Sequence, residues 1–169
     1  MIIRRLFACV IMAVFALSLC ACAPSVGELK FEAPKGWKKY RDTTRENSVM
    51  YSSASPYGVM IITFSDTTES DLSVNNIAKL REELIESVKE RGKAEIAEEG
   101  NIMAGGRLWL KMSFCYLDFG SPGNKVRWSY YVTRYNHKHY TFLMNCHESD
   151  FETLKPSLEQ VVNSVTFSD

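Results

Sequence analysis

The sequence lacks the short motifs that usually mark a catalytic or nucleotide-binding site. It has no G-x-S-x-G, no H-E-x-x-H, no Walker loop and no dinucleotide-binding glycine pattern. It also lacks internal repeats, low-complexity tracts and an excess of one charge, since 20 basic residues balance 20 acidic ones. These absences remove the commonest grounds for proposing an enzyme. The balanced charge gives no reason to expect nucleic acid as a partner.

An apolar run long enough to span a bilayer is missing as well. The apolar stretch from Leu6 to Leu19 is shorter than the ~20 residues that a membrane helix needs. Arg4 and Arg5 precede it, and small residues and cysteines follow it up to Ala23. This order of basic, apolar and small residues is typical of a secretory signal.

The end of this segment, Leu19-Cys20-Ala21-Cys22, resembles the lipobox of bacterial lipoproteins. Cleavage after Ala23 is the alternative, but Pro24 would then follow the cleaved bond, where it suits a protease poorly. The resemblance implies a signal peptide over 1–21, a covalent acylated lipid on Cys22 and no other cofactor. A short tether over 22–28 would then join a single domain over 29–169 to the membrane. Without Arg4 and Arg5 the chain carries 18 basic and 20 acidic residues, a net charge of −2.

The first half of the predicted domain combines strands and one helix. Alternation at 29–32 predicts a short strand, and β-rich runs at 48–53 and 59–64 flank Ser55-Pro56-Tyr57-Gly58, which suits a type I turn and hence a hairpin. A helix over 73–91 is predicted, with Ser73 as its N-cap and Gly92 after its end. Residues 94–99 then read as a short strand, with turns at Gly100-Asn101 and Gly105-Gly106.

The second half predicts a meander of three strands at approximately 107–119, 125–135 and 139–147. The connections are Ser121-Pro122-Gly123-Asn124, a type II pattern, and Asn136-His137-Lys138. Alternation places the even-numbered apolar residues of all three strands on one face. A final helix begins with the capping box Ser149-x-x-Glu152, and Pro156 should kink or divide it. We expect this helix to cover the even face, although the first helix could serve instead.

These elements predict an α+β fold, an antiparallel sheet with helices packed against it. Their order, with "FEAPKGW" at 31–37 and "VVNSVTF" at 161–167, resembles the PsbP-like sandwich superfamily, of the DcrB type. That superfamily includes extrinsic photosystem proteins and many small bacterial lipoproteins. The resemblance spans nearly all of the chain beyond the signal segment and implies partner binding or assembly rather than catalysis. No photosystem metal or anion ligand can be matched in this sequence.

Cys115 and Cys146 are the two cysteines that could pair once the signal is removed and Cys22 is modified. The predicted meander places Cys115 opposite Ser129 and Cys146 opposite Trp128, two strands apart at ~9.5 Å and on different faces. A disulfide needs Cα atoms within about 7 Å, so two free thiols are expected. Cys146 fits a core position, and an enzyme that uses Cys115 would need an exposed thiol of lowered pKa.

Two groups of residues could suggest a metal site, the three histidines and, for calcium, an acidic loop, but neither is a strong candidate. His137 and His139 flank one turn, but His147 lies about 26 Å along the strand. Asp66, Glu69 and Asp71 share a loop without the spacing of an EF-hand, and acids near a helix start already favour the helix dipole.

The odd-numbered face of the meander is the remaining candidate for binding. Aromatic and cationic side chains alternate on it, and such residues anchor many interfaces. The candidate contact residues are Trp109, Lys111, Arg127, Tyr131 and Tyr135. The alternative is a face partly covered by the helix of residues 73–91.

The sequence therefore predicts a bacterial envelope lipoprotein, lipid-anchored to the outer face of the cell membrane or to another envelope membrane. Its domain is expected to bind an envelope protein or ligand without catalysing a reaction. Two alternatives stay open: a thiol-dependent enzyme using Cys115, and a purely structural envelope component.

Overall fold

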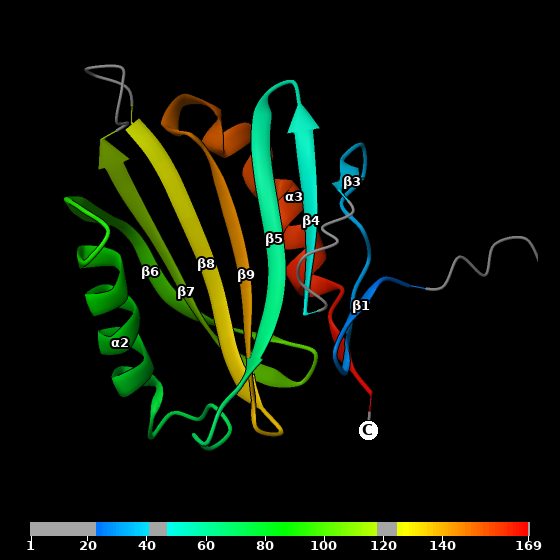
Figure 1. Ribbon diagram of the computed structural model, residues 1–169, viewed down its shortest axis with the longest axis vertical. Coiled ribbons are helices and arrows are strands. Elements are labelled where there is room, and N and C mark those ends of the chain that lie inside the picture. Colours follow the sequence, from blue (N-terminus) through cyan, green and yellow to red (C-terminus); the bar gives the residue numbers. More distant parts are fainter. Residues whose placement is uncertain (1–22, 41–46, 118–124, 169) are drawn as a thin grey trace, which may run out of the picture.

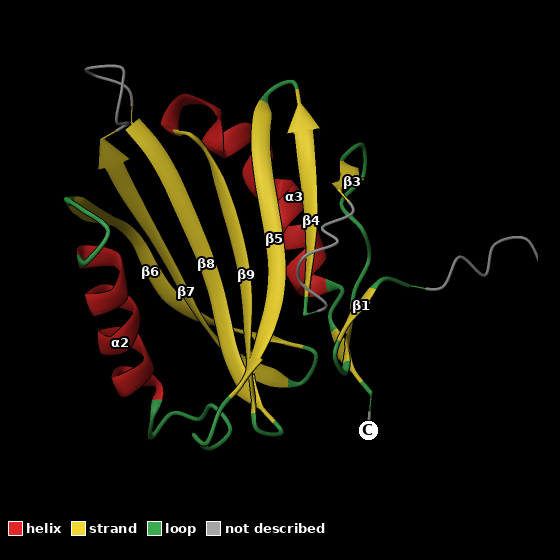
Figure 2. Ribbon diagram, in the orientation of Figure 1, coloured by secondary structure: helices red, strands yellow, loops and turns green. Residues whose placement is uncertain are grey.

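The computed structural model describes residues 23–40, 47–117 and 125–168, and shows two antiparallel sheets and two α-helices (Figures 1 and 2). The small sheet contains β1 (Ser25–Val26), β2 (Leu29–Lys30) and β10 (Thr166–Phe167). The large sheet contains β3 (Lys38–Tyr40), β4 (Ser48–Ala54), β5 (Tyr57–Asp66), β6 (Ala94–Ala104), β7 (Arg107–Leu117), β8 (Lys125–Tyr135) and β9 (Lys138–His147). The helices are α2 (Ile77–Lys89) and α3 (Phe151–Asn163), the latter preceded by the 3₁₀ turn η1 (Glu148–Asp150).

The α+β class predicted from the sequence is confirmed. The large sheet has the order β3-β4-β5-β9-β8-β7-β6, so the hairpin β4–β5 pairs with the last strand of the meander. The hairpin itself is confirmed, but its turn differs. Ala54 pairs with Tyr57, and the Ser55–Pro56 peptide between them is cis. A cis proline at the third position belongs to a type VI turn rather than to type I.

The strand β6 is longer than predicted. It runs through Gly100 and Asn101, where a turn was expected, and pairs with β7 as far as Ala104. A bulge between Ile96 and Glu98 shifts the register. The ladder with β7 supplies partners for the backbone here, and this contact with a neighbouring strand overrides the local turn preference of glycine and asparagine.

The connection between β8 and β9 contains two residues rather than three, and this changes which side chains share a face. Asn136 and His137 both have positive φ, at 48° and 58°, as a type I′ turn requires. Arg127 therefore pairs with Cys146, and the even residues of β9 lie on the same face as the odd residues of β7 and β8. The prediction of one even face across all three strands is wrong for β9, because a one-residue shift reverses every side chain.

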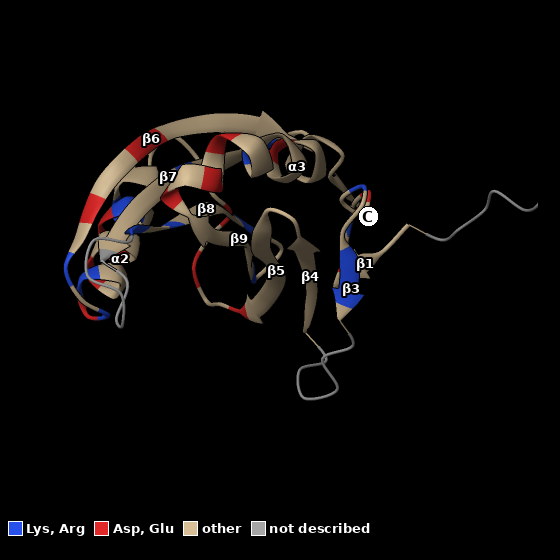
Figure 3. Cartoon of the chain, turned by 90° about the horizontal axis from the view of Figure 1, so that it is seen from above, with Lys and Arg blue, Asp and Glu red and all other residues tan. Residues whose placement is uncertain are grey.

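The two helices cover opposite faces of the large sheet (Figures 1 and 3). The helix α3 packs on the face that carries Trp109, Tyr131 and Phe142, whereas α2 packs on the face that carries Met112 and Tyr130. The final helix thus does not cover the even face of β7 and β8. The alternative, in which the first helix serves that face, is the arrangement observed.

The helix ends also differ from the prediction. Ser73 does not cap α2, which begins at Ile77 after a turn. Pro156 lies inside α3 without dividing it, and the predicted capping box at Ser149 is replaced by the turn η1. No helix within the described ranges is long and apolar enough to cross a membrane.

Candidate functional site

The side chains predicted as an exposed contact surface are mostly buried beneath α3. Trp109 is 0% exposed, Tyr131 2% and Arg127 7%. The Trp109 indole donates a hydrogen bond from Nε1 to the Ala104 carbonyl oxygen at 3.0 Å. The prediction of an exposed surface at these three residues is therefore wrong. Trp109 and Tyr131 belong to the core between the sheet and α3, and the Arg127 guanidinium lies 4.1 Å from the centroid of the Phe151 ring of α3.

Lys111 and Tyr135 are also engaged within the molecule. Lys111 Nζ lies 3.1 Å from a Glu98 carboxylate oxygen. The half-buried Tyr135 ring lies 4.9 Å from the ring of Phe167, and the Arg107 guanidinium lies 4.0 Å from the Tyr135 centroid. The structure thus brings the five predicted residues onto one face, as expected, but it places them against α3 and the small sheet.

Charged side chains of this face, of η1 and of α3 together form an ion cluster, made of Glu98, Lys111, Arg127, Glu148, Lys155 and Glu159. Glu98 of β6 is its centre, 2.9 Å from Lys155 on α3 and 3.1 Å from Lys111 on β7. Burial opposes ionisation of Glu98, but hydrogen bonds from Lys155 and Lys111 outweigh it and lower the pKa of this carboxyl. The cluster holds three cations and three carboxylates, so it joins α3 to the sheet without leaving a net charge.

Cys115 and Cys146 are both free, as predicted, but the prediction that they lie on different faces of the sheet is wrong. Arg127 pairs with Cys115 on one side and with Cys146 on the other, so the two thiols share a face and stand two strands apart. The Cys115 thiol donates to a Glu148 oxygen at 3.3 Å. Burial and this carboxylate raise the pKa of Cys115, and burial raises that of Cys146 to about 12. Neither environment favours the thiolate that nucleophilic catalysis requires.

The opposite face of the sheet carries a groove that the sequence reasoning missed. It has a volume of about 520 Å³ and runs between α2 and the strands β8, β9 and β5; we call it the α2 groove. Its floor contains Ile61, Leu143, Trp128 and Tyr130. Three of these positions form a cross-strand row, in which Ile61 pairs with Leu143 and Leu143 with Tyr130, and Trp128 lies two residues before Tyr130 on the same face of β8. The row combines β9 residues of odd number with β8 residues of even number, so it is visible only once the two-residue turn is known.

One end of the α2 groove is positively charged. Arg91 lines the groove just beyond α2, with its guanidinium 5.8 Å from the centroid of the Trp128 ring. No ion pair reaches Arg91 from residues 23–40, 47–117 or 125–168, whereas Glu83, the acid that lines the groove, is bound by Arg134. Burial and the nearby Arg134 lower the pKa of His139, which therefore adds no charge at neutral pH.

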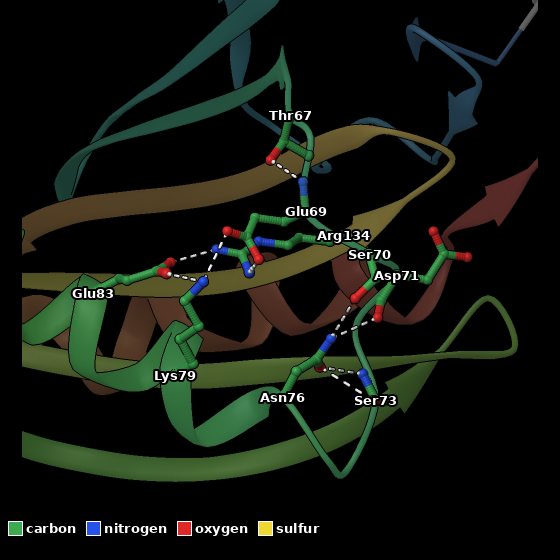
Figure 4. A network of polar contacts seen from close by, with 9 residues as sticks. All are labelled: Thr67, Glu69, Ser70, Asp71, Ser73, Asn76, Lys79, Glu83 and Arg134. Carbon is green, nitrogen blue, oxygen red and sulfur yellow. Dashed lines mark hydrogen bonds and ion pairs between the residues drawn. The ribbon is translucent and has the colours of Figure 1, made fainter.

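A polar network holds the start of α2 against the sheet (Figure 4). Arg134 of β8 forms ion pairs with Glu83 and Glu69, and Lys79 Nζ lies 2.8 Å from Glu69. Asn76, the residue before α2, accepts a hydrogen bond from the Ser73 backbone amide at 2.8 Å and donates to the Asp71 carbonyl at 2.9 Å. This network fixes the wall of the α2 groove relative to its floor.

The acidic loop of Asp66, Glu69 and Asp71, which could have suggested a calcium site, has two of its carboxylates bound by groups of the protein itself. Glu69 is turned toward Lys79 and Arg134, and Asp71 accepts a hydrogen bond from the Asn136 backbone amide at 2.9 Å. Within the described part of the chain, no group of three or more histidine, cysteine, aspartate or glutamate side chains could hold a metal ion. Cys22, the predicted site of lipid attachment, lies outside the described residues.

Comparison with known proteins adds evidence for the fold. No family model and no curated protein matches the sequence. Among solved structures, the PsbP protein of the cyanobacterium Synechocystis sp. PCC 6803 has a TM-score of 0.55 and 16% identity over 89% of this chain and 99% of that one. LpqN, involved in cell envelope biogenesis of Mycobacterium tuberculosis, has a TM-score of 0.58 and 13% identity over 83% of each chain.

A third structure, from Bacteroides thetaiotaomicron VPI-5482, has a TM-score of 0.54 and 14% identity. The match covers 86% of this chain but only 47% of that longer one. At such identities the likeness concerns the fold alone. The chain has a PsbP-like α+β fold, as the sequence resemblance predicted.

Proposed function

We propose that this protein is an exported, lipid-anchored binding module of a bacterial cell envelope, and that the α2 groove is its binding site. The N-terminal sequence supports export and lipid attachment at Cys22. The fold likeness to LpqN, a protein involved in cell envelope biogenesis, is consistent with the envelope. Envelope location, the anchor and the binding role are all parts of the proposal.

The observation that carries the binding role is the α2 groove itself. Its volume of about 520 Å³ lies within the range of roughly 300–1,000 Å³ that is usual for small-molecule sites. Its floor is apolar and aromatic, and the hydroxyl-bearing side chains of Ser87 and Thr141 also line it. A mostly apolar lining with a few polar groups is the general form of a ligand site.

The charge of the groove selects one class of ligand. Arg91 has no ion-pair partner among the described residues and lies beside the Trp128 ring, while Glu83 is neutralised by Arg134. A ligand with an apolar body and one anionic group would place the body on Leu143 and Trp128 and the anion at Arg91. We therefore propose a small anionic amphiphile as the occupant.

The alternative of an enzyme that uses Cys115 receives no support from the site. The thiol is half-buried, donates to Glu148 and has a raised pKa, so it is protonated at neutral pH. A purely structural component would need no groove. That alternative predicts that the protein binds no amphiphile at a defined position, whereas our proposal predicts such binding.

Two fluorescent probes of nearly the same shape test the proposal. The probe 8-anilinonaphthalene-1-sulfonate carries a sulfonate, and N-phenyl-1-naphthylamine is uncharged. Because the described residues that line the groove all lie beyond residue 22, a form of the chain that begins at Ala23 serves for the titration. We expect saturable binding of both probes, and Arg91→Gln should weaken the anionic probe by up to about fivefold while leaving the neutral probe unchanged.

Two further variants complete the design. Leu143→Asn should weaken both probes, because it removes part of the apolar floor. Arg81→Gln is the matched charge control, since Arg81 lies on the side of α2 that pairs with Glu99 of β6. Equal effects of Arg91→Gln and Arg81→Gln on the anionic probe, or the absence of saturable binding in the parent, would contradict the proposal.

A further inference from the structure

The strand β6 forms one edge of the large sheet, and only half of its length carries features that discourage pairing with another chain. It pairs with β7 alone among the described strands. The first half carries the bulge at Ile96–Glu98 and three glutamates, Glu95, Glu98 and Glu99. Charged residues and bulges are the devices that keep edge strands from pairing with other chains. Figure 3 shows the acidic residues confined to this first part of β6.

The second half of β6, residues 100–104, has neither device. Its sequence Gly-Asn-Ile-Met-Ala carries no charge, and its register with β7 is regular up to the Gly105–Gly106 turn. Met103 is 65% exposed, so an apolar side chain faces solvent in this half of the strand. A Cβ atom built on Gly100 would meet no atom within 4 Å, so the face of the strand is uncovered at this residue as well. We call residues 100–104 the open edge.

The hairpin geometry indicates which backbone groups of the open edge point outward. Gly105 and Gly106 have φ of 57° and 70°, as in a type I′ turn, so the closing pair Ala104–Arg107 is hydrogen-bonded. Hydrogen-bonded and non-bonded pairs alternate along an antiparallel ladder. Ile102 therefore bonds to β7, whereas the N–H and C=O groups of Asn101 and Met103 point away from the sheet.

We propose that two copies of this chain pair antiparallel through their open edges, with the twofold axis at Ile102. In this register Asn101 exchanges hydrogen bonds with the partner's Met103, and Met103 does so with the partner's Asn101. The outward-pointing groups of both strands are thereby used together. Ile102 of each copy faces its counterpart in a non-hydrogen-bonded pair, on the face where Ile102 already packs against the core.

The charges of β6 are compatible with this register. Glu99 and Glu98 would lie beside the partner's Gly105 and Gly106, so no two glutamates are brought directly opposite each other. Like charges at directly opposite positions destabilise a sheet, and a self-pairing centred in the first half of β6 would create them. The ladder is short, so the dimer is expected to be reversible in solution.

Disulfide trapping in the full-length chain tests the proposal. At the twofold axis the Cα atoms of a non-hydrogen-bonded pair stand about 4.5 Å apart, within the 4.4–6.8 Å range of a disulfide. Ile102→Cys should therefore give a covalent dimer upon mild oxidation of membranes that contain the protein. In Met103→Cys the Cα atoms of the two new cysteines would be roughly 8 Å apart. Although this position is more exposed, it should give less disulfide because the two residues are too far apart.

The parent protein, which has the same other cysteines, sets the background. A yield for Ile102→Cys at the background level, or below that of Met103→Cys, would overturn the proposal. A second pair of variants does not depend on trapping. Sedimentation of the detergent-solubilised full-length protein should show that Met103→Lys reduces dimerisation severalfold. Ile96→Lys should leave dimerisation unchanged, because Ile96 is a 46%-exposed apolar position on the same face but in the half of β6 that carries the bulge and the glutamates. Equal behaviour of the two lysine variants would also contradict it.

Discussion

The indole of Trp109 stacks on the ring of Phe142, with ring centroids 5.2 Å apart and ring planes 9° from parallel. The two residues belong to β7 and β9, which are separated by β8 in the sheet. The stack is fully buried and lies in the core between the sheet and α3. It therefore ties the outer part of the meander to its last strand.

Replacing Trp109 by alanine should lower the free energy of unfolding by about 3–5 kcal/mol. The change opens a cavity beside Phe142 and removes the hydrogen bond to the Ala104 carbonyl oxygen. Equilibrium unfolding in urea measures the loss. Tyr57→Ala, at a 59%-exposed position, is the control and should change stability by about 0.5 kcal/mol or less. A loss below about 1 kcal/mol for Trp109→Ala would show that this stack is not part of a packed core.

Cys115 should react slowly with iodoacetamide at neutral pH, because burial and the Glu148 carboxylate raise the pKa of its thiol. In Glu148→Gln the negative charge is gone, so the thiolate forms more readily and the rate should rise severalfold. Glu152→Gln changes the same charge at an exposed position of α3 and should leave the rate unaltered. Rapid labelling of the parent protein would reopen the possibility of a thiol enzyme.

Glu98 predicts an acid-sensitive component of stability. Its pKa in the folded protein lies below the ordinary value of 4.5, because Lys155 and Lys111 bind the carboxylate. This stabilisation is complete above pH 4.5 and is lost as the pH falls through the lower folded-state pKa. Unfolding free energies measured between pH 6 and pH 3 should fall less steeply in Glu98→Gln than in the parent. Glu95→Gln, at a side chain that is 83% exposed, should keep the parent slope, and a parent slope in Glu98→Gln would refute the role of the ion cluster.

The lipid anchor makes a prediction about location. In cells that export the protein, the parent should sediment with the membrane fraction, whereas Cys22→Ser should lose the lipid because serine offers no thiol for the thioether. Metabolic labelling with an alkyne fatty acid, followed by gel detection, reports the lipid directly. Cys20→Ser is the matched control and should remain labelled. Labelling that persists in Cys22→Ser would place the modification elsewhere.

The sequence predicted the fold class because alternation and turn residues define most strands of this sheet independently of tertiary contacts. It could not predict the face on which β9 lies, because a turn at 136–138 of two residues and one of three differ only in local backbone geometry. This difference of one residue in the length of the turn decides whether Cys146 stands opposite Arg127 or Trp128. The extension of β6 through Gly100 was hidden for a related reason, since the ladder with β7 is a non-local contact.

The candidate site shows the same limit. Trp109, Arg127 and Tyr131 were correctly grouped on one face, but the helix that covers this face could not be assigned from periodicity alone. The α2 groove depends on the pairing of Leu143 with Tyr130 and on the ion pair by which Arg134 holds Glu83 of α2. Neither relationship has a signature in the order of the residues.

The most direct test of the proposed function is a map of where an anionic amphiphile binds. Two-dimensional amide NMR of the form that begins at Ala23, titrated with 8-anilinonaphthalene-1-sulfonate, gives this map residue by residue. The account predicts saturable shifts concentrated at Ile61, Arg91, Trp128 and Leu143, with the face beneath α3 unaffected. Shifts centred on the face of Trp109 and Tyr131, or no saturable shift at any residue, would contradict the α2 groove as the binding site.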